Sequence, residues 1–488
     1  MRGGVVNDVM RGVQDNLFIG GELRPAHSAT RLPVINPATE EKFAAIPDAD
    51  ATDVDDAVTA AARAFRDSGW AQLAPAERAS YLRRLAELIE GRAEELGRLV
   101  TAQNGMPLAN SIAGNGTATG RYYRYFAGLA DELQPETERS GNGSRTVVRQ
   151  EPVGVAALIV PWNGPQGSIA WKLAPALAAG CTAVVKPAPE TSLDSYILAE
   201  LITQAGIPPG VVNIITGGRE TGATLVSHPR IDKVAFTGST AAGRKVALAC
   251  AERFTRVTLE LGGKSAAVLL DDVDLDSFAP FVASACAPFS GQICRALTRV
   301  LAPRSRYDEV VDVVAGAMGE LTVGDPLDPD TRLGPLVAAR QRDRVEGYIR
   351  SGREEGAKVV LGGGRPAGFD VGYYVEPTVF AGVGNQMRFA REEIFGPVLA
   401  VVPFDDDEDA IRLCNESDYG LGGAIFTRDA DRGLALARQV QSGSVGVNHY
   451  ALPIDAPFGG VKNSGIGREL GPEGLAAYLE TKAIYRTP

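Results

Sequence analysis

An α/β fold built on parallel sheets is the fold class that the sequence predicts, from three observations. From residue 153 onward, short apolar segments alternate with helical stretches of about 10–15 residues, a pattern typical of parallel strands with helices on both faces. The chain has 488 residues, which suggests about three domains. Its 45% hydrophobic and 22% charged residues are close to the average for globular proteins, so we expect a sizeable core.

The N-terminal part is predicted to contain short strands and two helices. Residues 31–50 are typical of short strands and turns. A helix follows, with Thr52 or Asp53 as its N-cap, because its apolar residues recur on one face. The next helix is expected to begin at Pro75, a residue type favoured at the first helical position, and to end near Val100.

The middle of the chain carries the alternation of strands and helices. Apolar strands are predicted over 153–160, 181–187, 211–216 and 233–237, with helices ending at Ala179 and spanning 193–206 and 240–253. A second α/β stretch between 265 and 460 has predicted strands at 265–270, 397–404 and 444–448. We interpret the first stretch as a Rossmann-like nucleotide-binding domain.

A polar hairpin interrupts this alternation at residues 132–151. Asn142-Gly143 stands between two polar, alternating stretches, which is a strong hairpin signal. The hairpin has too few apolar residues to be stable alone. We therefore expect it to pack against another element or another subunit, and the last strand-like segment, 481–486, is a candidate partner.

Charge and hydropathy disfavour several classes of partner. The chain has 60 acidic and 49 basic residues, a net charge of −11, and no block of Lys and Arg, which argues against nucleic acid or an anionic membrane. No apolar run reaches the roughly 18–20 residues that a membrane span needs. Residues 1–16 also lack the apolar core of a signal peptide, so none is expected there.

The cysteines and histidines indicate the redox setting and limit the kinds of site that the chain can form. Five cysteines, odd in number and without a CxxC pair, favour a reducing, cytoplasmic setting. His27, His228 and His449 lie far apart and share no metal-ligand spacing, so no metal site is expected. We therefore expect any general base to be a carboxylate rather than an imidazole.

Glycines follow the strand that ends at Thr237. The segment 238–243 runs from this strand into a helix, where backbone N–H groups and the helix N-terminus can bind a phosphate. An ordinary glycine turn with Ser239 as a helix cap explains the segment equally well. The spacing is not GxGxxG, and the GGKS at 262–265 is not a P-loop because the upstream position holds Thr258.

Three polar side chains stand where chemistry is possible, although each also has an ordinary structural explanation. Cys294 is flanked by glycine, glutamine and arginine, which indicates a polar turn and a candidate nucleophile, whereas the other cysteines are expected in the core. Glu260 ends an apolar run, and burial raises the pKa of a carboxyl group toward that of a general base unless a partner pairs with it. Asn163 follows a buried strand at its carboxyl end, where α/β sheets bind ligands, but asparagine is also common in turns.

Taken together with their surroundings, these residues resemble the aldehyde dehydrogenase superfamily almost from end to end. The matching motifs, in chain order, are INPATEE (35–41), PWNGP (161–165), KPAPET (186–191), FTGST (236–240), LELGGKS (259–265), GQIC (291–294), EEIFGPV (392–398) and PFGGVKNSGIGRELG (457–471). Each motif alone is moderate evidence, and eight in the family's order exclude coincidence.

The resemblance implies a division of the chain into three parts. A Rossmann-like NAD(P)-binding domain would comprise residues 1–131 and 152–260, and an α/β catalytic domain residues 261–465. A small β element, 132–151 and 479–488, would join subunits into a homodimer or homotetramer.

The resemblance also implies the catalytic roles. Cys294 would be the nucleophile that attacks an aldehyde to form a thiohemiacetal, with Asn163 and its own backbone N–H binding the oxyanion. After hydride transfer to NAD(P)+ leaves a thioacyl enzyme, Glu260 would activate the water that releases the acid. Lys172 and Glu469 match a proton relay to this glutamate, and a structural ion pair is the alternative.

The cofactor residues follow from the same resemblance. They are Pro161, Trp162, Lys186, Gly217, Gly238, Ser239, Leu261, Glu393 and Phe395. Many NAD-preferring relatives have a glutamate three residues after the lysine, where it would repel a 2′-phosphate, whereas this chain has Pro189 followed by Glu190. NAD is therefore the expected cofactor, with NADP left open.

The substrate pocket implied by the resemblance is roomy and largely apolar. Its residues are Gly164, Gly167, Trp171, Ile293, Arg295 and Phe458. Glycine at position 164, where many relatives have an aromatic residue, favours bulky apolar or aromatic aldehydes. Arg295 could bind a substrate carboxylate, although a surface-facing arginine is favoured. Two other functions stay open: a CoA-acylating relative, which commonly lacks the glutamate at position 260, and a scaffold that binds dinucleotide without turnover.

Overall fold

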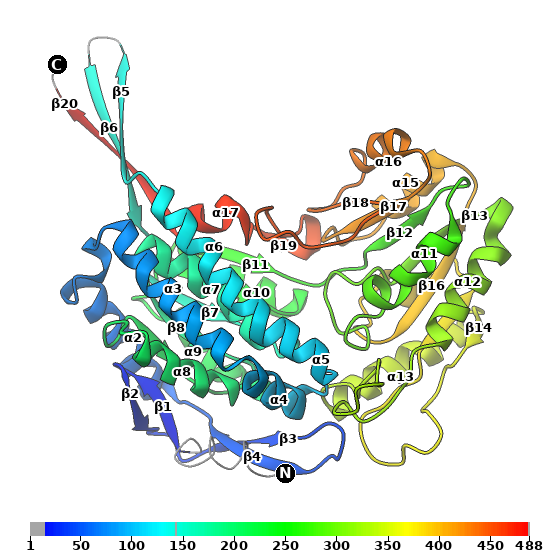
Figure 1. Ribbon diagram of the computed structural model, residues 1–488, viewed down its shortest axis with the longest axis horizontal. Helices are drawn as coiled ribbons and strands as arrows, with labels where there is room; N and C mark the ends of the chain where they lie inside the picture. The colour runs from blue at the N-terminus through cyan, green and yellow to red at the C-terminus, as the bar shows by residue number, and fades with distance from the viewer. Residues whose placement is uncertain (1–14, 142–143, 487–488) are drawn as a thin grey trace.

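Two mainly parallel sheets form the body of the protein in the computed structural model, which describes residues 15–141 and 144–486 (Figure 1). Within these ranges the strands form an eight-stranded sheet, a seven-stranded sheet, a three-stranded sheet and a two-stranded pair. Most of the N-terminal segment considered for a signal peptide (1–14) and the Asn142-Gly143 turn lie outside the described residues.

The first large sheet contains the predicted Rossmann-like alternation. In spatial order its strands are β19 (Gly465–Ile466), β11 (Arg256–Glu260), β10 (Lys233–Thr237), β7 (Val155–Ile159), β8 (Thr182–Lys186), β9 (Val212–Ile214), β1 (Asn16–Ile19) and β2 (Glu22–Pro25). The strands from β11 to β9 pair in parallel, so their carboxyl ends share one edge. The pair β3 (Arg31–Ile35) and β4 (Lys42–Pro47) accounts for the short strands expected over 31–50.

Helices cover both faces of this sheet, as predicted. α3 (Pro75–Gly91), α6 (Ala118–Glu132), α7 (Pro165–Ala179) and α8 (Asp194–Gln204) pack on one face, and α2 (Ala51–Asp67), α9 (Arg219–Ser227) and α10 (Thr240–Ala251) on the other. Residues of β7 alternate between the two cores: Ala156 and Leu158 face the first group, and Val155 and Ala157 the second. Both faces are therefore buried, which explains why the strands are apolar throughout.

Two predicted helix boundaries are wrong. Helix α2 is capped by Asp50, not by Thr52 or Asp53, because the Asp50 side chain accepts from the Asp53 N–H while the Asp53 carboxylate accepts from the Asp50 N–H. The helix expected from Pro75 to Val100 is two helices, α3 and α4 (Ala93–Asn104), separated at Arg92. The break directly follows Gly91, a poor helix former, while the apolar stripe continues into α4 and conceals the break in the sequence pattern.

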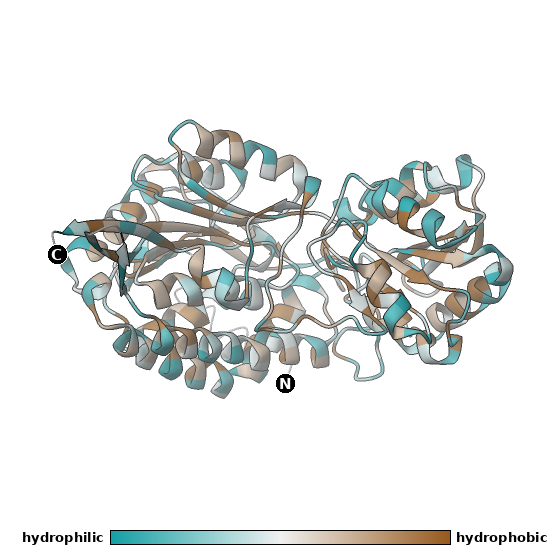
Figure 2. Ribbon diagram, turned by 90° about the horizontal axis from the view of Figure 1, so that it is seen from above, coloured by the Kyte–Doolittle hydropathy of each residue, from teal (hydrophilic) through white to brown (hydrophobic). Residues whose placement is uncertain are grey.

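The second large sheet has the same layered construction. Its strands, in spatial order, are β14 (Lys358–Leu361), β15 (Thr378–Ala381), β16 (Val398–Phe404), β13 (Arg299–Pro303), β12 (Ala266–Leu269), β17 (Gly423–Phe426) and β18 (Gly446–Val447). α11 (Leu275–Phe281) and α12 (Tyr307–Gly319) cover one face, and α13 (Ala339–Glu354), α15 (Asp407–Asn415) and α16 (Ala430–Ala437) the other. Figure 2 shows the hydrophobic strands of both sheets enclosed by helices with hydrophilic outer faces.

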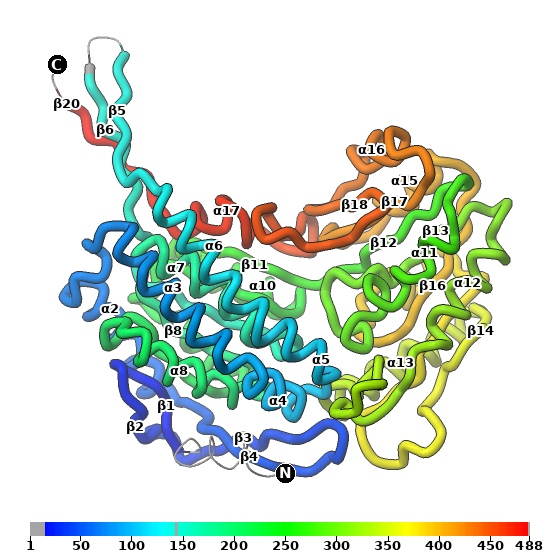
Figure 3. The backbone as a smooth tube through the Cα atoms, viewed as in Figure 1, coloured from blue at the N-terminus to red at the C-terminus, as the bar shows by residue number. Residues whose placement is uncertain are grey.

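The predicted hairpin pairs with the end of the chain. β5 (Glu136–Gly141) pairs with β6 (Ser144–Pro152), and β6 pairs along its length with β20 (Leu479–Arg486). This three-stranded sheet projects from the body beside the C-terminus (Figure 3), and Tyr485 is 79% exposed. Before reaching it, the chain returns to the first large sheet through β19 and α17 (Gly471–Ala476), which brings residues 458–469 next to β11.

Candidate active site

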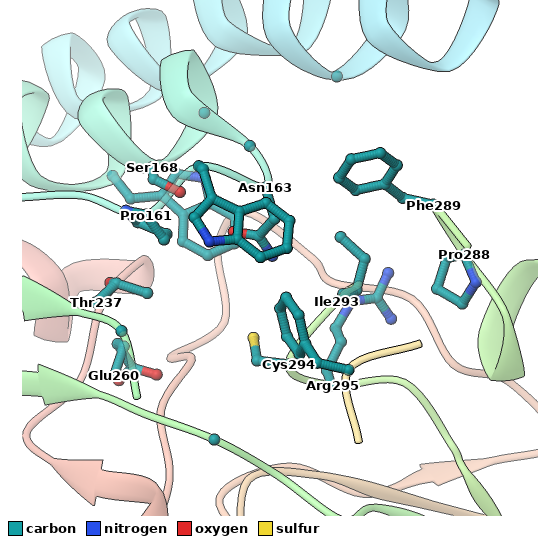
Figure 4. Close-up of a pocket in the computed structure, with 18 of the residues that line it drawn as sticks. Pro161, Asn163, Ser168, Thr237, Glu260, Pro288, Phe289, Ile293, Cys294 and Arg295 are labelled. Carbon is teal, nitrogen blue, oxygen red and sulfur yellow. The ribbon is translucent and has the colours of Figure 1, made fainter. Parts of the chain in front are cut away.

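A cavity of about 760 Å³ collects side chains from both halves of the protein. It lies at the carboxyl ends of β7, β10 and β11, with Cys294 and its neighbours from the segment 288–295 across from Glu260 (Figure 4). Glu393, Phe395, Ala451, Leu452 and Phe458 also line it. Most of the expected site residues line it: Cys294, Glu260, Asn163, Pro161, Trp162, Gly238, Ser239, Leu261, Glu393, Phe395, Gly164, Gly167, Trp171, Ile293, Arg295 and Phe458. Lys172, Glu469, Lys186 and Gly217 do not line the cavity.

Cys294 lies in the turn that precedes β13 and is half-buried. Burial, with the nearby Glu393 and Glu260 carboxylates, raises the pKa of its thiol to about 12, although Arg295 opposes this. The thiol is therefore protonated at neutral pH and needs a base. The other four cysteines are buried, as expected.

The turn before Cys294 has an unusual backbone. Phe289, Ser290 and Gly291 have φ of 48°, 53° and 73°, all in the left-handed region. A Cβ at Gly291 would stand 2.1 Å from a backbone oxygen of Gly396, so only glycine fits there. Sparsely populated backbone conformations of this kind are concentrated at functional sites.

Asn163 is held against the same turn. Its Nδ2 donates to the backbone oxygen of Gln292 at 2.8 Å, and the Gln292 side chain accepts from the Val337 N–H at 3.0 Å. The amide thus stands between the end of β7 and the residues next to Cys294, held by a backbone oxygen whose own residue is anchored at Val337.

Glu260 ends β11 and is 2% exposed. Neither carboxylate oxygen has a hydrogen-bond partner within the described part of the chain, and Figure 4 shows the carboxylate pointing across the cavity toward Cys294. Burial and the charge of Glu469 raise the pKa of Glu260 well above its usual value, while Lys172 and Arg468 lower it. An unpaired buried carboxylate of this kind is a strong proton acceptor.

Lys172 and Glu469 form a buried ion pair next to Glu260. The Lys172 Nζ lies 2.7 Å from the Glu469 Oε1 and donates to the Thr237 hydroxyl at 2.6 Å. Both charges act on the pKa of Glu260, in opposite directions. The ion pair is thus present, and the proton relay stays a prediction.

One end of the cavity has features that suit a dinucleotide. Ser239 caps α10 by accepting from the Ala242 N–H, so the N-terminus of this helix faces the edge where β10 ends. Glu393 accepts from the Gly263 N–H at 3.0 Å, and a Cβ at Gly262 would stand 2.6 Å from its other oxygen.

Lys186 and Gly217 lie beyond the cavity lining. Lys186 ends β8, burial lowers its pKa to about 8, and its Nζ donates to the Pro187 oxygen. Glu190 pairs with Arg340 at 2.6 Å, so this carboxylate is directed to a partner other than Lys186. The described residues contain no cluster of His, Cys, Asp and Glu that could hold a metal ion.

The other end of the cavity is apolar and open. The Trp171 ring makes edge contacts with Tyr122 at 5.7 Å and Phe458 at 5.5 Å. A Cβ at Gly164 would meet no described atom within 4 Å, and at Gly167 the nearest is 3.7 Å away. The space that the missing side chains would fill is therefore part of the cavity.

Sequence reasoning missed several residues of this end. Met106, Asn115, Tyr122 and Leu452 line the cavity, but no charge pattern or motif distinguishes them in the sequence. Arg295, for which a surface-facing position was favoured, lines the cavity, and its guanidinium stacks 5.1 Å from the Tyr450 ring centroid.

Among the described residues, no helix is both long and apolar enough to cross a membrane.

These features define a class: an α/β enzyme with a cysteine and a buried glutamate in a cavity between two sheets. Residues 24–484 match the sequence profile of the aldehyde dehydrogenase family. A geranial dehydrogenase of Castellaniella defragrans is 48% identical over 471 residues, which cover 96% of this chain and 98% of that protein.

Solved structures agree with the sequence comparison. A Mycobacterium tuberculosis aldehyde dehydrogenase complexed with NAD+ superimposes with a TM-score of 0.94 at 46% identity, covering 96% of this chain and 98% of that one. A mutant aldehyde dehydrogenase of Pseudomonas syringae complexed with NAD+ and octanal has a TM-score of 0.94 at 40% identity, with 97% of each chain covered. The chain belongs to the aldehyde dehydrogenase family, which confirms the resemblance, the expected fold and the expectation of an enzyme.

Proposed function

We propose that the protein oxidises bulky apolar or aromatic aldehydes to carboxylic acids with NAD+, through a thioacyl intermediate on Cys294. One observation carries the proposal: Cys294, Glu260 and Asn163 line the same cavity, which has a helix N-terminus at one end and an open apolar wall at the other. We assign the cofactor to residues 1–131 and 152–260, the nucleophile to 261–465, and subunit contacts to 132–151 and 479–488.

The first step is attack by sulfur. Because its pKa of about 12 keeps the Cys294 thiol protonated, Glu260 accepts the thiol proton as the sulfur bonds to the aldehyde carbon. The carbonyl oxygen becomes an oxyanion, which the second N–H of the Asn163 amide and the Cys294 backbone N–H bind. NAD+, which we assign to the end of the cavity that contains Ser239 and Glu393, would supply the acceptor for the hydride of this carbon, and a thioester would then remain on the sulfur.

Glu260 then promotes hydrolysis. Once the thiol proton has passed on to the Lys172–Glu469 pair, the Glu260 carboxylate takes a proton from water as the water oxygen attacks the thioester carbon, and the carbon–sulfur bond breaks with its electron pair on sulfur to release the acid. We propose that Glu260 passes each proton it gains to the adjacent Lys172–Glu469 pair, whose charges are close enough to shift the Glu260 pKa.

The cavity supports NAD as cofactor and a bulky aldehyde as substrate. Ser239 at the α10 N-terminus suits a pyrophosphate, and Glu393, held by the Gly263 N–H, suits ribose hydroxyls. The relatives complexed with NAD+ support the same choice. The open wall at Gly164, the geranial dehydrogenase and the octanal complex support bulky apolar substrates.

The structure also bears on the CoA-acylating alternative. Glu260 stands unpaired in the cavity that holds Cys294, an arrangement that favours water as acyl acceptor. The purified enzyme with NAD+ and an aldehyde panel should form NADH and the free acid, with no acyl-CoA when CoA is added. Cys294→Ala should abolish NADH formation. An active Cys294→Ala enzyme, or an acyl-CoA product, would overturn the proposal.

The assembly and setting are part of the proposal. The projecting sheet β5–β6–β20 exposes apolar side chains such as Tyr485 and Ile484, which supports its use in a homodimer or homotetramer. The five free cysteines support a reducing cytoplasm. Light scattering of the purified protein tests the assembly.

A further inference from the structure

Arg295 places a positive charge at the apolar end of the cavity. The residue directly follows Cys294 and is half-buried. Figure 4 shows its guanidinium on the side of Ile293 and Phe289, away from Glu260. The charge therefore faces the space that we assign to the body of the substrate.

The described residues offer this guanidinium few hydrogen-bond acceptors and no ion-pair partner. Its Nη1 donates to the Tyr450 backbone oxygen at a long 3.5 Å, and the group stacks on the Tyr450 ring. No carboxylate of the described residues lies within ion-pair distance, 4.0 Å, of Arg295. Arg299, by contrast, is buried and donates to the backbone oxygens of Lys264, Leu413 and Cys414 and to the Asn385 side chain. Because a guanidinium has five N–H donors, most of those of Arg295 are left for a ligand.

We propose that Arg295 binds a carboxylate of the substrate, so that the preferred substrates are bulky aldehydes with a carboxylate group away from the aldehyde carbon. This inference rests on the proposed function, since it takes the cavity as the aldehyde site. A planar guanidinium matches the two oxygens of a carboxylate, and a charge-assisted pair strengthens where water is partly excluded. The ring or chain of such a substrate would lie against Trp171 and the open wall at Gly164.

A second role for the same charge can be separated by experiment. Arg295 also lowers the pKa of the Cys294 thiol, though less than burial raises it. If thiol activation were its function, removing the charge would slow the oxidation of every aldehyde alike. A carboxylate-binding residue instead affects only substrates that carry the carboxylate.

The test compares 4-carboxybenzaldehyde with 4-methylbenzaldehyde, which is neutral and has its substituent at the same ring position. In Arg295→Met, kcat/KM for the carboxylated aldehyde should fall by at least about 30-fold, while that for the methyl analogue changes by no more than about threefold. Arg295→Lys should recover part of the loss. Arg304→Met, which removes an exposed arginine paired with Asp405, is the matched control and should leave both values unchanged.

The outcomes separate this inference from the proposed function. A native enzyme that oxidises 4-methylbenzaldehyde but rejects 4-carboxybenzaldehyde overturns the role of Arg295 and leaves the proposed function standing. An equal loss for both aldehydes in Arg295→Met also overturns it. A native enzyme that oxidises neither these nor longer apolar aldehydes overturns the proposed function itself. The comparison of the two aldehydes on the native enzyme does not need the Arg295→Met variant. The inference can therefore be overturned even if that variant fails to fold.

Discussion

Replacement of Gly164 by phenylalanine tests the open wall of the cavity. The residue has φ of −162°, outside the left-handed region that favours glycine, and an added Cβ meets no described atom within 4 Å. The new ring therefore enters the cavity without disturbing the fold. At this N-cap position, which has no side-chain cap bond, we expect a change in unfolding free energy below about 1 kcal/mol.

The expected effect is on substrate size. Forcing a bulky aldehyde into the reduced space should cost about 1–3 kcal/mol, as overpacking does, which lowers its kcat/KM by about 5- to 150-fold. Acetaldehyde, which does not need this space, should be affected little. The assay is NADH formation with a branched or aromatic aldehyde and with acetaldehyde.

Gly316→Phe provides the matched control. Gly316 lies on α12, away from the cavity, and a Cβ there also meets no atom of the described residues within 4 Å. In this variant the ratio of kcat/KM for the bulky aldehyde to kcat/KM for acetaldehyde should equal that of the native enzyme. Equal losses for large and small aldehydes in Gly164→Phe would refute the assignment of this wall to the substrate.

Three further predictions concern the charges and the backbone around the site. Glu469→Gln removes a charge that raises the pKa of Glu260, so the acidic limb of the profile of kcat against pH should move to lower pH. Lys172→Met removes a charge that lowers this pKa and should move the same limb to higher pH. Profiles that do not move would contradict the coupling of these charges to Glu260. Pro189→Glu should lower the ratio of kcat/KM for NADP+ to kcat/KM for NAD+ by at least about tenfold, because the new carboxylate repels the 2′-phosphate. An unchanged ratio would show that position 189 does not face the 2′-phosphate. In Gly291→Ala the new Cβ would be strained at φ 73° and would collide with a backbone oxygen. The free energy of unfolding, measured with urea, should fall by at least about 2 kcal/mol, and native-like stability would contradict the turn geometry.

The sequence predicted the elements that depend on local pattern. The strands from β7 to β11 are apolar because both faces of the sheet are covered, and this pattern is visible in the sequence. The pairing of 481–486 with the hairpin was also predictable, because the hairpin had too little apolar surface of its own. The break at Arg92 was not, since the apolar stripe continues across it.

The site was predictable in part. Cys294, Glu260 and Asn163 stand in motifs whose order resembles a known family, so their meeting in one cavity could be expected. Tyr122 and Leu452 could not be found, because they reach the cavity from distant segments through tertiary packing alone. The side of the turn on which the Arg295 guanidinium lies depends on its contact with Tyr450, 155 residues away in sequence.

The most direct test of the central claim is to trap the acyl group on the sulfur. Glu260→Gln, given NAD+ and an aldehyde, should form NADH more slowly than the native enzyme, because the thiol has lost its base, and should stop at one NADH per subunit, because the thioester is no longer hydrolysed. Intact-protein mass spectrometry should show a gain equal to the aldehyde less two hydrogens, located on the peptide that contains Cys294. Continued turnover without an adduct, or an adduct on another residue, would contradict the account.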